Sequence, residues 1–224
     1  MAGLSVSEAA VELGLSRQRV VQLIGAGRLP AVRVGRVWVI PEVGLAEFRA
    51  ARRPGVRPMS ARMARGMVDL VGQHLGAPAG EAWSGLADRD RSRLRRHWEQ
   101  LVADPDPAVL LRGWLPQRSR VERFVLAGDP ADLLADPRVG AGGAAHPGLG
   151  LSGGDVVEPH VAEADRAGLV SDWLLVPALG GNVLLRSEPV VRVDLAACLA
   201  DVADAGGSRN ERAVAGVLGS GISR

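Results

Sequence analysis

The chain has 224 residues, 47% of them hydrophobic, so it can hold about two or three compact units with buried cores. No apolar stretch approaches the roughly 18–20 residues that a membrane-spanning helix needs, and the N-terminus lacks the basic and apolar regions of a signal peptide. The single cysteine, Cys198, cannot form an internal disulfide, and we interpret it as a small hydrophobic residue on a helix. We therefore expect a cytoplasmic protein with no membrane segment.

Charge is distributed unevenly along the chain, although the net charge is only +2. All 27 basic residues are Arg, because the sequence contains no Lys. Residues 1–53 contain 8 Arg and 4 acidic residues, residues 54–128 contain 12 and 8, and residues 129–224 contain 7 and 13. The net charges are thus +4, +4 and −6, which favours nucleic-acid contact on the N-terminal side; uneven solvated charge is the alternative. The Ala-, Gly- and Arg-rich composition is typical of a high-GC genome, as in actinobacteria.

Two short helices joined by a tight turn are predicted near the N-terminus. Ser5 or Ser7 can cap the first helix, because a hydroxyl accepts a hydrogen bond from a free N–H of the first turn. Gly14 then ends this helix, since glycine adopts positive φ without strain. Ser16 opens a second helix over 17–24. Together these features predict a helix-turn-helix, whose second helix is the one that enters the major groove of DNA.

The second helix has one apolar and one polar face. Its apolar positions follow the i, i+3, i+4 spacing of a core-facing stripe: Val20, Leu23 and Ile24. The side chains left on the outside, together with the capping Ser16, are the predicted base-reading and phosphate-binding set: Arg17, Gln18, Arg19 and Gln22. Arg and Gln have the donor geometry that recognises guanine and adenine edges.

A hairpin is predicted over 31–41, where two β-branched runs flank a turn at Gly35 and Arg36. We expect Arg33 and Arg36, beside this turn, to contact the DNA backbone or the adjacent minor groove. Trp38 lies in an apolar strand and is interpreted as a core residue rather than a base-stacking one. Pro41 can occupy the first turn of a third helix that carries Val43, Leu45 and Phe48.

The order of helix, turn, helix, hairpin wing and helix resembles the excisionase-like, MerR-type DNA-binding domains. The matching segments are SVSEAAVELGLS, RVVQLIGAGRLPAVRVGR and the step WVIP before the closing helix. The resemblance covers about a quarter of the chain and implies a winged helix-turn-helix that binds double-stranded DNA.

The whole chain is predicted to be α+β, with four successive regions. Residues 1–53 form the winged helix-turn-helix, and 54–59, with two Pro and one Gly, form a linker. Residues 60–128 are mostly helical, and 129–224 form a small α+β region. In the helical region, the five Arg between 89 and 96 offer a second DNA-facing patch or, alternatively, an ordinary solvated helix face.

The C-terminal region alternates strand and helix patterns. A strand is predicted over 155–161, a helix over 163–173, and two strands that flank Gly180 and Gly181 as a hairpin. Two helices follow over 193–204 and 208–219, the second opened by a capping box of Ser208 and Glu211.

This layout resembles actinobacterial helix-turn-helix proteins related to the abortive-infection type IV antitoxins. The segments that carry the resemblance are RPMSARMARGMVDLVG, LADPRVGAGGAAH, GGNVLLR and DLAACLADVAD. It departs from the family pattern after LADPR, where glycines and a proline interrupt the expected helix. The resemblance implies an antitoxin with a cognate toxin of the nucleotidyltransferase type.

No catalytic, metal or cofactor site is predicted. The four His do not have metal-ligand spacing, and Cys198 has no recognisable base. Glu158 and His160 would share a strand face and could form a general-base pair, but we interpret them as a surface histidine with solvated carboxylates. The glycines between 140 and 155 lack the Lys of a phosphate-binding loop, and their G-x-G-x-x-G match has no strand before it.

The sequence therefore predicts a sequence-specific DNA-binding transcriptional regulator that is not an enzyme. The protein partners that we consider are a second copy of the chain, in a homodimer, and a cognate toxin. Two alternatives stay open: an excisionase-type architectural factor in site-specific recombination, and an unrecognised enzyme activity in the C-terminal region.

Overall fold

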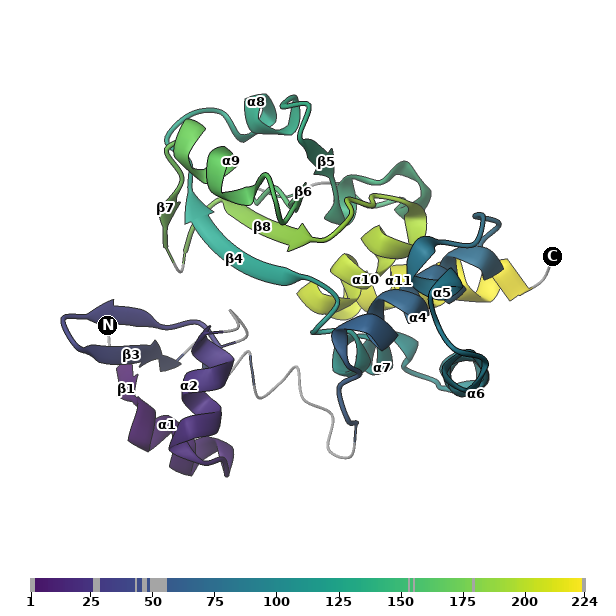
Figure 1. Ribbon diagram of the computed structural model, residues 1–224, viewed down its shortest axis with the longest axis horizontal. Coiled ribbons are helices and arrows are strands. Elements are labelled where there is room, and N and C mark those ends of the chain that lie inside the picture. The colour runs from purple at the N-terminus through teal and green to yellow at the C-terminus, as the bar shows by residue number, and fades with distance from the viewer. Residues whose placement is uncertain are drawn as a thin grey trace.

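A computed structural model describes residues 3–25, 29–42, 44–45, 48, 56–152, 154, 156–178 and 180–222. These residues form helices, one three-stranded sheet and one five-stranded sheet (Figure 1). The predicted α+β class is therefore confirmed. The buried apolar residues form three clusters, one in the N-terminal unit, one among helices, and one against the five-stranded sheet.

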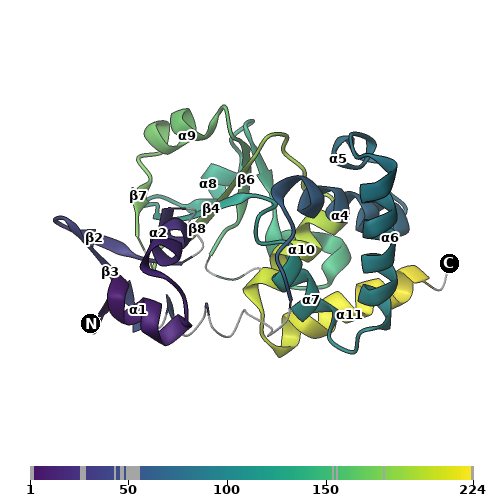
Figure 2. The same ribbon diagram turned by 60° about the horizontal axis from the view of Figure 1, so that its bottom comes forward.

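The N-terminal unit contains a pair of helices, an antiparallel sheet of order β1-β3-β2 and, after the sheet, further helical residues at 42, 44, 45 and 48. Its elements are β1 (Gly3–Ser5), α1 (Val6–Leu13), α2 (Arg17–Gly25), β2 (Val32–Val34) and β3 (Val37–Pro41). Its core joins both helices to β3 through Ala9, Ala10, Val20, Leu23, Ile24, Leu29, Ile40 and Leu45. The predicted helices and wing are thus confirmed, and β2 and β3 project as a hairpin (Figure 2).

Strand β1 was not anticipated, and it changes the role of Pro41. This residue is the last of β3 and lies opposite Gly3 of β1, so it precedes the third helix instead of occupying its first turn. The third helix itself is confirmed, because the described residues that follow are helical: Glu42, Gly44, Leu45 and Phe48. Proline is accepted there because it closes a strand and need not donate further along the ladder. Leu45 is buried and Phe48 packs against the same core as predicted, whereas Val43 lies outside the described residues.

A larger helical unit surrounds the second core. Its helices are α4 (Ala61–His74), α5 (Glu81–Ser84), α6 (Asp88–Ala103), α7 (Pro107–Trp114), α10 (Leu195–Ala205) and α11 (Ser208–Ile222). Helix α10 packs against α4, α7 and α11 and is capped at its N-terminus by Asp194. Ser60 caps α4, because its side chain accepts a hydrogen bond from the Met63 N–H. The prediction of a capping box formed by Ser208 and Glu211 is wrong. Ser208 is the first helical residue, and the Glu211 carboxylate accepts a hydrogen bond from Arg112 instead.

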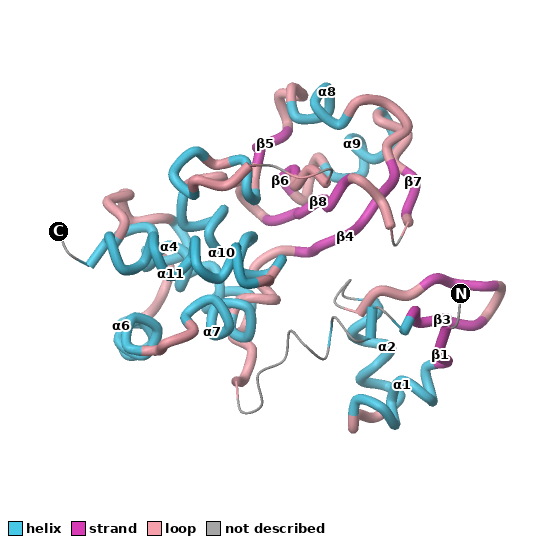
Figure 3. Tube along the Cα trace, turned by 180° about the vertical axis from the view of Figure 1, so that it is seen from behind, coloured by secondary structure: helices cyan, strands magenta, loops and turns pink. Residues whose placement is uncertain are grey.

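The five-stranded sheet has the order β5-β6-β8-β4-β7. Its strands and the short helices beside it are β4 (Arg120–Val125), α8 (Pro130–Leu134), β5 (Val139–Ala141), β6 (Pro159–Ala162), α9 (Arg166–Asp172), β7 (Val176–Pro177) and β8 (Val183–Glu188). Strands β6 and β8 are parallel, and the other neighbours are antiparallel. Seen from behind, the large helices gather on one side of the sheet (Figure 3).

The predicted hairpin between the strands around Gly180 and Gly181 is wrong. Strands β7 and β8 do not pair with each other, because both pair with β4, which lies between them. A Cβ on Gly181 would overlap the backbone of Phe124, so only a glycine allows the two backbones to approach this closely. The side chain of Asn182 then exchanges two hydrogen bonds with the backbone of Leu126, at 2.9 and 3.1 Å.

The alternation along β8 gives the sheet two different faces. Val183 and Leu185 join the apolar core beneath α9, whereas Arg186 forms ion pairs with Asp201 and Asp204 of α10. One face is therefore held by apolar packing and the other by buried charges. Contacts also join residues on the two sides of the predicted boundary at residue 128, because β4 pairs with β8 and α10 packs on α4. The boundaries of the predicted regions stay predictions.

Candidate functional site

A tight turn sets the second helix of the N-terminal unit against the first. Ser5 accepts a hydrogen bond from the Glu8 N–H, and the Glu8 carboxylate accepts one from the Ser5 N–H, which closes a capping box at the start of α1. Gly14 ends α1 at a φ of 62°, in the left-handed region that glycine adopts at low cost. The chain therefore reverses over Leu15 and Ser16 and enters α2.

Helix α2 presents the predicted contact residues to solvent. Ser16 Oγ accepts a hydrogen bond from the Arg19 N–H at 3.2 Å, which confirms that Ser16 opens the helix. The inward residues are buried as predicted: Val20, Leu23 and Ile24. The outward residues are all exposed: Arg17, Gln18, Arg19 and Gln22. One Arg19 N–H donates to the Gln22 amide oxygen at 3.1 Å, so these two side chains lie on the same surface.

The wing places two further arginines at an exposed turn. Gly35 has a φ of 60°, and Arg33 and Arg36 on either side of it are exposed. The Arg33 guanidinium lies 5.9 Å from the centre of the Trp38 ring, within the range of a cation–π contact. Trp38 packs against the core of the unit, as predicted. The structure thus gives one unit with a polar helix face and a basic wing tip.

The arginines of α6 have mixed surroundings. Arg91 donates to Asp88 and to the carbonyls of Trp83 and Ser84, and the Arg95 guanidinium lies 5.5 Å from the Trp83 ring centre. These two side chains therefore hold α5 against α6. This favours the interpretation of the run as an ordinary helix face over that of a second DNA-facing patch.

Residues 4–53 match the family model described as a helix-turn-helix domain. With the geometry above, this shows that the N-terminal unit is a helix-turn-helix DNA-binding domain, with DNA as its partner. No curated protein and no solved structure matches the chain. No helix among the described residues is both long enough and apolar enough to cross a bilayer.

A second set of polar side chains lies between the five-stranded sheet and α10. We call it the ionic cluster, and it consists of Arg118, Glu158, His160, Arg186, Glu188, Asp201 and Asp204. Asp201 is its centre: its carboxylate accepts from Arg118 at 2.9 Å, Arg186 at 3.0 Å and His160 at 2.8 Å. It also accepts from the Gly143 N–H at 3.1 Å. The cluster is thus a buried ion-pair network that joins sheet and helix.

His160 is buried, so its interpretation as a surface histidine is wrong. The reason is that β6 is an inner strand, covered by α10 on the face that carries His160. Its Nδ1 lies 2.7 Å from Glu188 and its Nε2 2.8 Å from Asp201. Burial alone would lower the pKa of His160, but the charge of Asp201 and the two carboxylate hydrogen bonds outweigh it and raise the pKa to about 9. The imidazole is therefore charged at neutral pH.

Glu158, the carboxylate considered as a general-base partner of His160, instead forms an ion pair with Arg186, at 3.2 Å. Burial raises the pKa of Glu158 and opposes the lowering effect of Arg186. Asp201 shows the opposite balance, because Arg186 and His160 hold its pKa below the usual range in spite of its burial. Cys198 is buried on α10, as predicted, and burial raises its thiol pKa to about 12.

Two of the glycines between 140 and 155, Gly142 and Gly143, lie against this cluster. Gly143, at a φ of 66°, directs its N–H to Asp201, and a Cβ on Gly142 would overlap the His160 ring. Gly148 lies in the short 3₁₀ helix Pro147–Leu149, so the G-x-G-x-x-G match is not followed by the α-helix that dinucleotide binding requires. The described residues contain no cluster of side chains suited to a metal ion.

One sequence signal could have revealed the cluster. Arg186 interrupts the apolar strand NVLLRSE, and Asp201 interrupts the apolar helix DLAACLADVAD. Charged residues are almost never fully buried unless they are paired, so a charge in such a segment predicts an opposite charge elsewhere. The identity of the partners depends on the fold.

Proposed function

We propose that the protein is a sequence-specific transcriptional regulator that reads the major groove with α2 and contacts the adjacent backbone with the β2–β3 wing. The observation that carries the proposal is the exposed polar face of α2, opposite its buried face. Its Arg and Gln side chains can form two-point contacts with guanine and adenine.

The first prediction of this proposal concerns base recognition. Arg17→Ala or Arg19→Ala should weaken binding to the specific site by about 1–3 kcal/mol, because a two-point guanine contact is lost, and should affect scrambled DNA less. Fluorescence anisotropy with both duplexes measures the difference. Arg212→Ala, which removes an exposed arginine of the acidic C-terminal region, is the matched control. An equal loss on both duplexes for Arg17, Gln18, Arg19 and Gln22 would show that these residues do not read bases.

The second prediction concerns the wing. If Arg33 or Arg36 binds a phosphate, its replacement by Ala should reduce the slope of log K against log salt by about 1, because one fewer counterion is released. Titrations at four or more salt concentrations measure this slope. Unchanged slopes in both variants would remove the wing tip from the interface.

We further propose that the C-terminal region acts by binding, as a dimer interface or as the surface for a cognate toxin of the nucleotidyltransferase type, and not by catalysis. Residues 129–224 carry a net charge of −6, which disfavours contact with phosphates. The resemblance to type IV antitoxins supports a toxin partner. In His160, carboxylates hold both ring nitrogens, so neither is free to accept a substrate proton.

An excisionase-type factor is the less favoured alternative. Such factors consist of little more than the DNA-binding domain, whereas about 170 residues follow residue 53 here. Among the described ones, these residues form two further apolar cores. A folded region of this size favours a regulator with a second interaction.

The third prediction compares the full chain with a fragment of residues 1–60 on DNA that has two half-sites one helical turn apart. The fragment contains the complete N-terminal core, so we expect it to keep sequence preference but to lose cooperativity. Band-shift titration measures cooperativity, and light scattering measures the oligomeric state. If the fragment binds as tightly and as cooperatively, and the full chain is a monomer with no bound toxin, the C-terminal region does not assemble the complex.

A further inference from the structure

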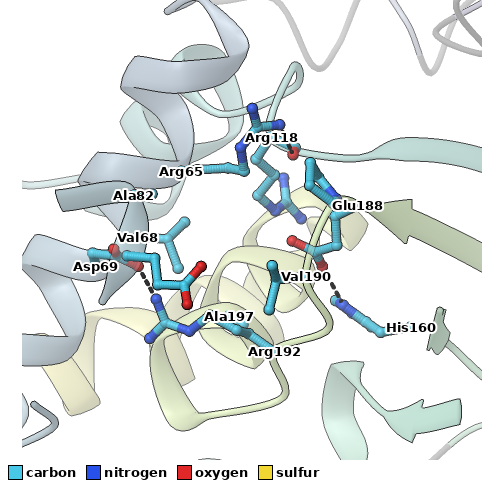
Figure 4. Close-up of a pocket in the computed structure, with 12 residues that line it drawn as sticks. Arg65, Val68, Asp69, Ala82, Arg118, His160, Glu188, Val190, Arg192 and Ala197 are labelled. Carbon is cyan, nitrogen blue, oxygen red and sulfur yellow. Dashed lines mark hydrogen bonds and ion pairs between the residues drawn. The ribbon is translucent and has the colours of Figure 1, made fainter. Parts of the chain in front are cut away.

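An apolar cavity lies between α4, α5, α10 and the segment after β8 (Figure 4). Its volume is about 300 Å³, at the lower end of the range for small-molecule sites. We call it the inner cavity, and its apolar lining consists of Val68, Ala82, Pro189, Val190 and Ala197. At one end, Asp69 forms an ion pair with Arg192 and accepts a hydrogen bond from the Trp83 N–H, so these polar groups are mutually satisfied.

A second hollow of about 400 Å³ adjoins the other end of the inner cavity. It lies where β4 begins and β8 ends, and we call it the outer hollow. The two share four lining residues: Arg65, Arg118, Glu188 and Pro189. The two hollows therefore meet at these residues, and a ligand that occupies both would pass them.

Two serine hydroxyls in the lining of the outer hollow have no hydrogen-bond partner in the described part of the chain: Ser119 Oγ and Ser187 Oγ. Ser187 is only 2% exposed. Buried hydroxyls are normally hydrogen-bonded, and an exception requires an explanation. Each oxygen exposes less than 1 Å² in this structure, so a ligand in the outer hollow would supply the missing partner once the hydroxyl rotates about its Cα–Cβ bond.

Arg65 adds an uncompensated positive charge at the junction. It donates to the backbone carbonyl of Arg118 at 3.3 Å and has no ion-pair partner among the residues that the structure describes. The other charged groups there are engaged: Glu188 with His160 at 2.7 Å, and Arg118 with Asp201 at 2.9 Å. In the lining of the outer hollow, the groups left over are thus a guanidinium and two hydroxyls, which can all donate to an anion; the Glu81 carboxylate lines only the inner cavity.

We propose that the inner cavity and the outer hollow form one binding site for a small amphipathic anion. Its carboxylate or phosphate binds Arg65 and the hydroxyls of Ser119 and Ser187. Its apolar part occupies the inner cavity against Val68 and Val190. This site is formed by residues between 65 and 197, outside the N-terminal unit, and does not depend on the DNA-binding function proposed above.

Direct titration of the full chain without DNA tests the proposal. The probes are octanoate, octyl phosphate, inorganic phosphate and octan-1-amine, which matches octanoate in length but carries the opposite charge. We expect octanoate or octyl phosphate to bind roughly tenfold or more tightly than the amine and than inorganic phosphate. The stronger of the two identifies the headgroup. Glu81 also lines the cavity, so equal or tighter binding of the amine would indicate a cation site and overturn the proposal.

Variants locate the binding. Arg65→Gln should weaken the preferred probe roughly tenfold, because a charge-assisted hydrogen bond is lost. Val190→Trp should block the apolar part, and it is tolerable in the fold because Val190 is 54% exposed. Arg89→Gln, on the exposed surface of α6, is the control. Unchanged binding in both Arg65→Gln and Val190→Trp would refute the site.

Ser187→Ala separates a binding role from a structural one. Because this hydroxyl has no partner in the structure, its removal should leave the thermal midpoint of the unliganded protein unchanged or higher. The same variant should reduce the increase in midpoint that the preferred probe produces. A lower midpoint without the probe, together with an unchanged increase, would show that the hydroxyl is structural and contradict its role in binding.

Discussion

Replacing Asp201 with Ala should lower the free energy of unfolding by about 3–5 kcal/mol, because it leaves buried positive charges without their central partner. The carboxylate is fully buried and contacts Arg118, Arg186 and His160. Removing one partner from such a network is strongly destabilising, because the remaining charges stay buried and cannot regain water. This loss of stability is far larger than the stability that the whole network adds relative to apolar residues in its place. Urea denaturation followed by circular dichroism measures the loss.

Two further variants make this measurement interpretable. Asp201→Asn keeps the shape and one acceptor oxygen, so it should fold and lose less stability than Asp201→Ala. Asp88→Ala removes a carboxylate that is 97% exposed and pairs with Arg91 at 3.2 Å, and it should change the stability by no more than about 0.5 kcal/mol. Similar values for Asp201→Ala and Asp88→Ala would mean that the ionic cluster does not hold the sheet to α10.

The stability of the protein should fall by about 3 kcal/mol as the pH rises from 6.5 to above 9. The pKa of His160 is raised from 6.5 to about 9 in the folded protein. The folded state therefore binds this proton more tightly than the unfolded state, so the stabilisation is complete below pH 6.5 and is lost as the pH rises through 9. The difference between the two pKa values corresponds to about 3 kcal/mol. Unfolding free energies at several pH values measure it.

The composition of the chain makes this pH range easy to interpret. There is no Lys and no Tyr, so their usual alkaline titrations are missing. Burial raises the pKa of the Cys198 thiol to about 12, so its contribution is lost only above about pH 9. Burial lowers the pKa of His74 and His97, so their titration changes the stability only below pH 6.5. The groups that face His160 are Glu188 and Arg186 of β8 and Asp201 of α10.

His160→Gln should remove most of the slope between pH 6.5 and 8.5, although it also lowers the stability at pH 6.5. Cys198→Ala, on the same helix as Asp201, should leave the slope in this range unchanged. An undiminished slope in His160→Gln would show that another group causes the pH dependence.

Local signals in the sequence determined most of the N-terminal unit. The capping hydroxyl of Ser5, the positive φ of Gly14 and the apolar spacing of α2 all act within a few residues, so their outcome does not depend on distant contacts. The same holds for the caps Ser60 and Asp194. The exposure of the α2 contact residues followed from the same spacing, whereas their role in base recognition stays a prediction.

Only the tertiary structure decided which strands pair and which charges meet. Alternation along β8 shows which residues share a face, but it does not show that β4 lies between β7 and β8. The contacts of Asp201 join residues that are 41 positions apart for His160 and 83 for Arg118. A buried charge requires an opposite partner wherever the chain can bring one, and that partner is selected by the packing of α10 on the sheet, not by any local pattern.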